Sequence, residues 1–337
     1  MAGLRKGGWE CHNAGMLRRT FLSSSVAVGA LAASRRATGS PVKAGDIPKR
    51  VLGKTGEKLT IIGQAGGRFP KISFEEAKAV TERAYSLGIN YFDCARLYWN
   101  GRSEEVYGAV LPPFRKNIFL TSKSAERSRK GAEADLEKSL RALKTEYLDL
   151  WQIHQVSEMS EVEQIFAPGG AIEAFEAAKQ AGKCRFIGFT GHHDPEVHLA
   201  MLKHYDKYDT ILMPLNAADP AYMSFEKMVL PVAVERGMGI QAMKSTANAG
   251  LLTGIELKDC LSYALSLPIH ALALGCTTIG QVEDDVRIAQ QFQPMTGEEM
   301  ADVRKRASRM AGPRMENWKR DTERSGAPRH SDGGAPA

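Results

Sequence analysis

Four side chains that can hold or transfer a proton lie at or just beyond the ends of short apolar runs. They are Asp93, Tyr98, Lys123 and His154. A tyrosine hydroxyl has an ordinary pKa near ~10, and we expect the ammonium group of a neighbouring lysine to lower it. Asp93 would keep Lys123 charged, and His154 would orient a carbonyl oxygen by donating a hydrogen bond. Each residue alone could equally be structural, so the prediction depends on all four meeting.

These four groups can protonate a carbonyl oxygen, but none of them can supply a hydride. A nicotinamide cofactor is the natural hydride source. No metal centre is expected, because His192 and His193 are adjacent residues that seldom face one site. The five cysteines lack a C-x-x-C spacing, and we expect free, partly buried thiols rather than disulfides. Arg96 either binds an anionic substrate or is solvated in a loop.

The apolar runs that precede these residues are short and unbroken, as expected of strands buried on both faces. Eight such strands are predicted: Leu59–Gly63, Tyr91–Cys94, Ile118–Thr121, Leu148–His154, Arg185–Phe189, Ile211–Leu215, Gly239–Met243 and Ala271–Gly275. Longer stretches with helical spacing separate them: one that begins with the capping box Ser73–Glu76 and runs to about Ser86, then Glu133–Leu143, Ala171–Ala181, Pro195–Tyr205, Phe225–Glu235, Leu257–Leu265 and Gln281–Gln290.

This alternation predicts an α/β fold with a parallel sheet. Eight units in roughly 270 residues fit a single closed (β/α)8 TIM barrel better than an open doubly wound sheet. No G-x-G-x-x-G or Walker sequence lies at a strand-to-helix turn, which argues against the Rossmann and P-loop folds. Val51–Gly56 and Leu59–Ile62 predict a short N-terminal β-hairpin. We expect the barrel to occupy residues 45–312, with a disordered Gly- and Pro-rich tail at 313–337.

The first 39 residues form a leader that differs from the rest of the chain. They hold six basic side chains and one acid, so most of the net charge of +6 lies there and the body shows no basic stripe for nucleic acid. The twin arginine in Leu17–Leu22 precedes the weakly apolar stretch Ser23–Ala33, with small residues at Ala30–Ala32. This pattern resembles a twin-arginine translocation signal.

The leader predicts export to the periplasm or beyond, with the twin-arginine machinery as a partner. The alternative is a chance arginine pair in a basic arm, and Met16 is an alternative start. No apolar run approaches the ~20 residues that span a bilayer, so no stable membrane anchor is expected.

Three segments around the four proton-handling residues resemble the aldo-keto reductase family, over roughly residues 50–290. The first is Phe92–Tyr98 with Ser103–Glu105 and Gly108; the second is Ser139–Leu143 and Tyr147–Leu150 up to His154; the third is Gly182–Thr190. The resemblance implies that Asp93, Tyr98, Lys123 and His154 are a catalytic tetrad, with Tyr98 as the general acid in reduction. It also implies NADP(H), held without a Rossmann domain.

The same resemblance suggests positions that hold the cofactor. Thr190 and Asn216 would contact the nicotinamide amide, and Met243 would pack on the ring beside Lys244. The loop from Ser245 through Gly250 to Leu252 would surround the pyrophosphate. The adenosine would lie at Gly275, Thr277, Gln281 and Asp285. No basic residue occupies the usual 2′-phosphate position, so NAD(H) remains an alternative to NADP(H), unless Lys244 or Arg287 compensates.

We therefore expect an oxidoreductase that transfers a hydride between NADP(H) and a small carbonyl or alcohol substrate. One alternative is an exported cofactor-binding or sensory barrel with little turnover. Another is a barrel hydrolase, although the strand ends lack the paired carboxylates of a glycosidase.

Overall fold

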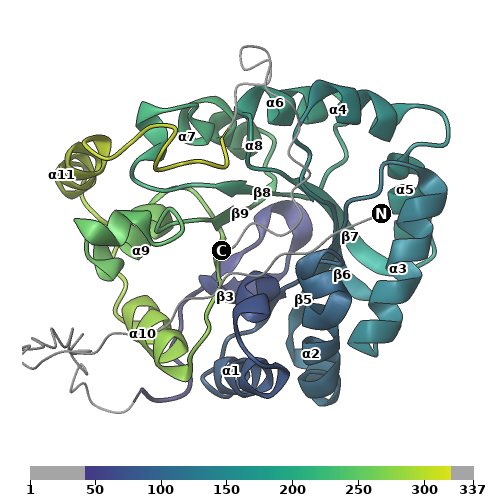
Figure 1. Cartoon of the computed structure of the whole chain (residues 1–337), viewed down its shortest axis with the longest axis horizontal. Helices are drawn as coiled ribbons and strands as arrows, with labels where there is room; N and C mark the ends of the chain where they lie inside the picture. The colour runs from purple at the N-terminus through teal and green to yellow at the C-terminus, as the bar shows by residue number, and fades with distance from the viewer. Residues whose placement is uncertain (1–41, 320–337) are drawn as a thin grey trace, which may run out of the picture. The chain divides into compact units, whose positions relative to one another are not determined.

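The computed structural model describes residues 42–319. Eight parallel strands close into a barrel in the order β10-β3-β4-β5-β6-β7-β8-β9 (Figure 1). The predicted (β/α)8 TIM barrel is thus confirmed. The barrel strands are β3 (Ile62–Ala65), β4 (Tyr91–Asp93), β5 (Phe119–Ser124), β6 (Leu148–Ile153), β7 (Cys184–Thr190), β8 (Thr210–Pro214), β9 (Gly239–Met243) and β10 (Ala271–Leu274).

Helices surround the barrel and cover the outer face of its strands (Figure 1). Their bounds are α1 (Phe74–Ser86), α2 (Arg102–Val110), α3 (Arg129–Leu143), α4 (Met159–Phe166), α5 (Ala171–Gln180), α6 (Pro195–His204), α7 (Phe225–Met228), α8 (Leu230–Glu235), α9 (Leu257–Ser266), α10 (Ile279–Gln290) and α11 (Gly297–Ser308). The expected capping box is present at α1, where the Ser73 hydroxyl accepts from the Glu76 amide.

The structure differs from the sequence prediction in several elements. Helices α2, α4 and α11 were not predicted. The expected helix Phe225–Glu235 is divided into α7 and α8, since Pro231 at the start of α8 has no amide hydrogen to continue the first helix. The expected strand Leu59–Gly63 is likewise two strands.

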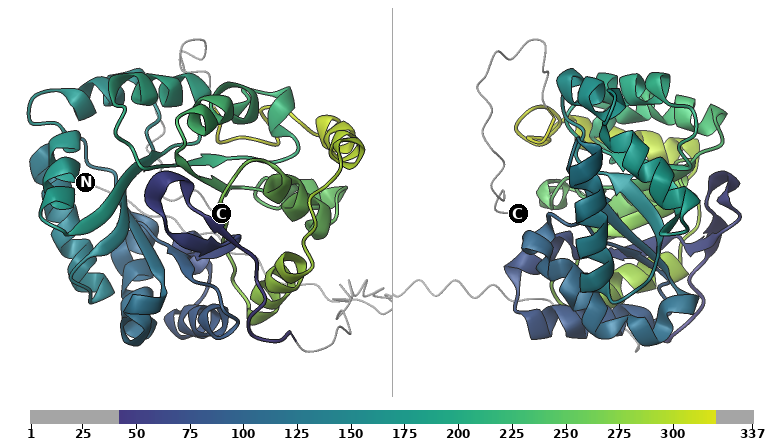
Figure 2. Two further views of the ribbon diagram at one scale, coloured as in Figure 1. Left: turned by 180° about the vertical axis from the view of Figure 1, so that it is seen from behind. Right: turned by 90° about the vertical axis from the view of Figure 1, so that its right-hand side faces the viewer.

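The predicted N-terminal hairpin is present as β1 (Lys49–Val51) and β2 (Lys58–Thr60), which pair antiparallel. Its apolar side chains Leu52 and Leu59 pack with Tyr91, Phe119 and Leu150 of the barrel interior. At Gly53, where φ is +50°, a Cβ would lie 2.3 Å from the backbone nitrogen of Gly239 at the start of β9. The hairpin, purple in Figure 2, therefore closes the amino-terminal end of the barrel and leaves the carboxyl ends of the strands for a site.

The four cysteines in the described part of the chain are buried and have free thiols. No helix between residues 42 and 319 is long and apolar enough to cross a membrane. The leader with its twin arginine lies outside the described residues.

Candidate active site

The four proton-handling side chains meet at the carboxyl ends of three neighbouring strands. Strands β4, β5 and β6 are adjacent in the barrel and position Asp93, Lys123 and His154. Tyr98 begins the short 3-10 helix η3 (Tyr98–Gly101) that follows β4. Lys123 Nζ lies 5.0 Å from the centroid of the Tyr98 ring. The Tyr98 and His154 rings contact edge to face, with centroids 5.4 Å apart.

Lys123 is fully buried and is held by oxygen acceptors. Its Nζ donates to Asp93 Oδ2 at 2.6 Å and to the carbonyl of Cys94 at 2.7 Å. The other oxygen of Asp93 accepts a hydrogen bond from Thr121 Oγ1 at 2.9 Å. Burial by itself lowers the pKa of Lys123, but the charge of Asp93 and the nearby Tyr98 outweigh burial, and the pKa is raised. Lys123 is therefore an ammonium ion at neutral pH.

The pKa of Tyr98 differs from the sequence expectation. Lys123 does lower it, as expected, but burial raises it by more, and the net pKa of Tyr98 lies above its ordinary value. The phenolate would lose more hydration energy at this buried position than the charge of Lys123 returns. Tyr98 consequently keeps its proton at neutral pH.

His154 is a neutral imidazole. Burial lowers its pKa well below the ordinary value, and the charges of Lys123 and Arg127 lower it further. Its Nδ1 has no hydrogen-bond partner among the described residues. A neutral imidazole can donate through one nitrogen and accept through the other, so His154 can hydrogen-bond a ligand oxygen.

The carboxyl ends of β7, β9 and β10 carry most of the expected cofactor residues. Thr190 ends β7 and Met243 ends β9, while Ser245 follows in the next loop and is buried. Thr277 and Gln281 lie at the amino end of α10, where the Gln281 side chain accepts from the Thr277 amide at 2.7 Å. A capping box between Thr278 and Gln281 already satisfies amides at this end of α10, and the helix dipole there still attracts phosphate.

Lys244 and Arg68 supply positive charge at this rim. Burial and the charge of Arg68 together lower the pKa of Lys244 to about 8. Arg68 was missed in the sequence, although it follows Gly66 and Gly67 directly after the first barrel strand. It donates to Asn248 Oδ1 at 2.9 Å. It also packs on Gly275, where a Cβ would lie 2.5 Å from Arg68 Cγ.

Two expected cofactor residues are engaged elsewhere. The Asn216 side chain is fully buried: its oxygen accepts from the amide of Ala218, and its nitrogen donates to Glu316. Asp285 is buried and accepts a hydrogen bond from Cys276 Sγ at 3.2 Å. Both side chains are committed to internal contacts, and we leave them out of the cofactor site. Leu252 is 43% exposed, and Gly250 lies against Met315.

The predicted disordered tail begins too early. Residues 313–319, the C-terminal segment, pack on the loops after β8 and β9. Lys319 is buried and its Nζ lies 2.6 Å from Asp219 Oδ1 and 3.0 Å from Glu316. Trp318 lies under Lys244, whose Nζ is 4.7 Å from the ring centroid. Glu316 and Lys319 look like residues of a solvated tail in the sequence, but each forms a hydrogen bond with a residue 100 positions earlier in the chain. The rest of the tail lies outside the described residues.

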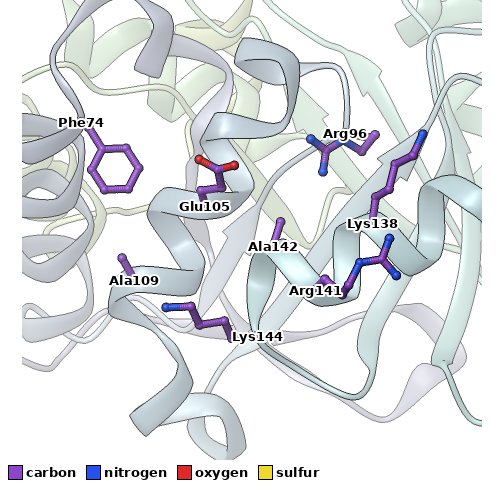
Figure 3. A pocket seen from close by; sticks show the side chains of 8 residues that line it. All are labelled: Phe74, Arg96, Glu105, Ala109, Lys138, Arg141, Ala142 and Lys144. Carbon is purple, nitrogen blue, oxygen red and sulfur yellow. The ribbon is translucent and has the colours of Figure 1, made fainter.

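A surface groove lies outside the barrel, between α2 and α3. Its volume is about 680 Å³ and its lining, shown in Figure 3, is Phe74, Arg96, Glu105, Ala109, Lys138, Arg141, Ala142 and Lys144. None of the four proton-handling side chains contributes to it. Between residues 42 and 319, no group of three or more His, Cys, Asp or Glu side chains is placed to hold a metal ion.

Comparison with known proteins agrees with this geometry. The model of the aldo/keto reductase family matches residues 62–262. L-galactose dehydrogenase of Arabidopsis thaliana is 33% identical over 74% of this chain and 90% of its own length. An uncharacterised oxidoreductase of Bacillus subtilis is 32% identical over 53% of this chain, which spans 58% of that relative.

Solved structures share the fold. An aldo-keto reductase of Bacillus halodurans, in its holo form, superposes with a TM-score of 0.69 at 24% identity, covering 80% of this chain and 99% of that one. An aldo/keto reductase of Klebsiella pneumoniae in complex with NADP and acetate gives a TM-score of 0.65 at 20% identity, covering 78% of this chain and 96% of that one.

Proposed function

The chain belongs to the aldo/keto reductase family, and we propose that it transfers a hydride between NADP(H) and a small carbonyl or alcohol substrate. The observation that carries the proposal is the meeting of Asp93, Tyr98, Lys123 and His154 at one end of the barrel. NADP(H), when bound, supplies or accepts the hydride.

Each residue of the tetrad has a distinct role in this proposal. Tyr98 holds a proton at neutral pH because its pKa is raised, and it donates that proton to the carbonyl oxygen in reduction. The Lys123 ammonium stabilises the phenolate that remains, and Asp93 keeps this lysine charged and in place. Neutral His154 orients the carbonyl oxygen by a hydrogen bond.

The rim of the barrel offers groups that fit the proposed cofactor. Lys244 and Arg68 bring positive charge to the loop that follows β9, and the amino end of α10 lies beside them in the same rim. These cations can attract the phosphates of the cofactor, and only a contact with the 2′-phosphate, which NAD(H) lacks, would favour NADP(H) over NAD(H). Thr190 and Met243 remain our candidates for the nicotinamide end. The NADP complex of the Klebsiella structure supports this choice by analogy.

Two further features complete the proposal. The assembled tetrad favours turnover over a barrel that only binds its cofactor. We also propose export through the twin-arginine pathway, on the sequence Leu17–Leu22 alone. Mass spectrometry of the protein from its native compartment tests this, because an exported protein lacks the leader and a retained one keeps it.

Reduction of a panel of aldehydes and quinones by NADPH tests the proposed activity. We expect repeated turnover by the wild type. Tyr98→Phe should abolish turnover while nicotinamide fluorescence still reports binding of NADPH. Tyr85→Phe, which removes a hydroxyl from the outer helix α1, is the matched control and should keep full activity. Normal turnover by Tyr98→Phe would refute the role of Tyr98 as the general acid. If the wild type turned over none of the substrates, the proposed reductase activity would be refuted.

A further inference from the structure

The loop that carries Tyr98 has an unusual backbone. Trp99 and Asn100 both have φ of 52°, and Gly101 follows with φ of 87°. Residues with a side chain avoid this left-handed region, and two in succession persist only where surrounding contacts hold them. Tyr98 therefore depends for its position on side-chain contacts that hold this backbone.

Arg96 makes several of the contacts that hold this loop. Its Nη2 donates to the carbonyl of Asn100 at 3.0 Å, across the two left-handed residues. Its guanidinium also packs against Gly101, where an added Cβ would lie 1.0 Å from Nη2. Its own backbone amide donates to the carbonyl of Lys123 at 3.0 Å. One residue thus touches both the Tyr98 loop and the strand of the catalytic lysine.

The second nitrogen of the guanidinium connects the loop to a buried carboxylate. Arg96 Nη1 donates to Glu104 Oε2 at 2.5 Å, and the Glu104 side chain is fully buried at the start of α2. The other oxygen of Glu104 accepts from Ser122 Oγ at 2.5 Å. Ser122 lies on β5 immediately before Lys123. The chain of contacts therefore begins beside Tyr98 and ends beside Lys123.

The Arg96 side chain lies at the outer groove and not over the tetrad. Its guanidinium lines the outer groove with Lys138 and Arg141 of α3 (Figure 3). The side chain is 18% exposed and paired with Glu104, which excludes a freely solvated arginine as well as an anion-binding group over the tetrad. The sequence suggested that Arg96 binds an anionic substrate or is solvated in a loop. In the structure it instead joins the Asn100 carbonyl to the carboxylate of Glu104.

We propose that Arg96 is a positioning residue, which holds the Tyr98 hydroxyl and the Lys123 ammonium at their working separation by bridging the Asn100 carbonyl and Glu104. The inference rests on the proposed function, because it assigns Arg96 a role in the same proton transfer. Loss of the bridge lets the Tyr98 loop relax, so that the phenol lies beside the ammonium for a smaller fraction of the time.

Steady-state kinetics of Arg96→Met tests the proposal, with NADPH and an aldehyde that the wild type reduces. We expect kcat to fall 10- to 100-fold, while KM and the Kd of NADPH change less than threefold. Arg96→Lys can still pair with Glu104 and should recover part of kcat. Arg141→Met removes an exposed arginine from the same groove and should leave all constants unchanged.

The pH profile distinguishes positioning from a loss of fold. Because Lys123 lowers the pKa of Tyr98, a loosened loop should move the basic limb of the kcat profile to higher pH. Unchanged kcat and an unchanged profile in Arg96→Met would overturn the proposal. If Arg96→Met does not fold, Ser122→Ala can take its place, because it removes a single hydrogen bond to Glu104. We expect the same shift of the basic limb to higher pH in this variant. An unshifted profile in Ser122→Ala would also overturn the proposal.

The two proposals fail in different ways. If Tyr98→Phe keeps normal activity, the proposed function is wrong. If Tyr98→Phe is inactive while Arg96→Met behaves as the wild type, only the positioning role is wrong.

Discussion

Lys123 Nζ lies 2.6 Å from Asp93 Oδ2, and the lysine is completely buried while the aspartate side chain is 3% exposed. A buried ion pair adds little stability by itself, but removal of one partner leaves the other charge without compensation. The cost of breaking the pair can therefore be measured separately from its proposed role in proton transfer.

Lys123→Met should lower both stability and turnover. We expect the free energy of unfolding to fall by about 3–5 kcal/mol, because the Asp93 carboxylate stays buried without its counter-ion. Turnover should fall roughly 100- to 10,000-fold. The double variant Lys123→Met/Asp93→Asn should recover most of the stability and none of the activity, as measured by denaturant unfolding and NADPH oxidation. A single variant as stable as the wild type would contradict the buried pair.

Cofactor affinity should fall as the pH rises through about 8, the pKa to which burial and the charge of Arg68 lower Lys244. The lysine is cationic below that pH and attracts phosphate, and it is neutral above it. We expect the Kd of NADPH to rise several-fold between pH 7 and pH 9, as followed by nicotinamide fluorescence. Arginine keeps its charge over this range, so Lys244→Arg should flatten the profile. Equal slopes in both proteins would exclude Lys244 as the cause.

Asp285 should make the fold less stable at alkaline pH. Burial raises the pKa of Asp285 to about 7, so the folded state keeps a proton that the unfolded state releases. Its stabilising contribution is full below the unfolded pKa and is lost as the pH rises through 7. Between pH 5.5 and pH 8 the loss should be about 2 kcal/mol, since one pKa unit corresponds to about 1.4 kcal/mol.

The variant Asp285→Asn isolates this effect, because the amide does not titrate. Relative to the wild type, it should gain about 2 kcal/mol of unfolding free energy on going from pH 5.5 to pH 8. Guanidinium unfolding at the two pH values measures the difference. An identical pH dependence in both proteins would show that Asp285 is ionised throughout.

The C-terminal segment should contribute to stability through Lys319. Lys319→Met removes the cation that lies between Asp219 and Glu316 and leaves two buried carboxylates unpaired. We expect a loss of about 3–5 kcal/mol in denaturant unfolding. Lys116→Met, at an exposed lysine, is the matched control and should change stability by less than about 0.5 kcal/mol. Equal stability of the two variants would mean that the segment is detached in solution.

The barrel could be predicted because each strand is a local pattern. Short apolar runs alternate with helical spacing, and Asp93, Lys123 and His154 each lie at or next to the end of such a run. The helices that escaped prediction have weaker local signals. In α2, Gly108 weakens the local helical signal, and a glycine is needed there because a Cβ would lie 1.9 Å from the carbonyl oxygen of Ala142. Helix α11 buries only Val303 and Ala307.

The sequence by itself determined the fold class, the family resemblance and the four proton-handling residues that the structure brings together, since these depend on residue type and short-range spacing. Only the tertiary structure decided which polar side chains are paired inside the protein and which remain available to a ligand. It engaged Asn216 with Glu316, brought Arg68 to Lys244, and joined Arg96 to Ser122 through Glu104. The reason is that burial and charge pairing join groups far apart in the chain, and no local pattern encodes which of them will meet.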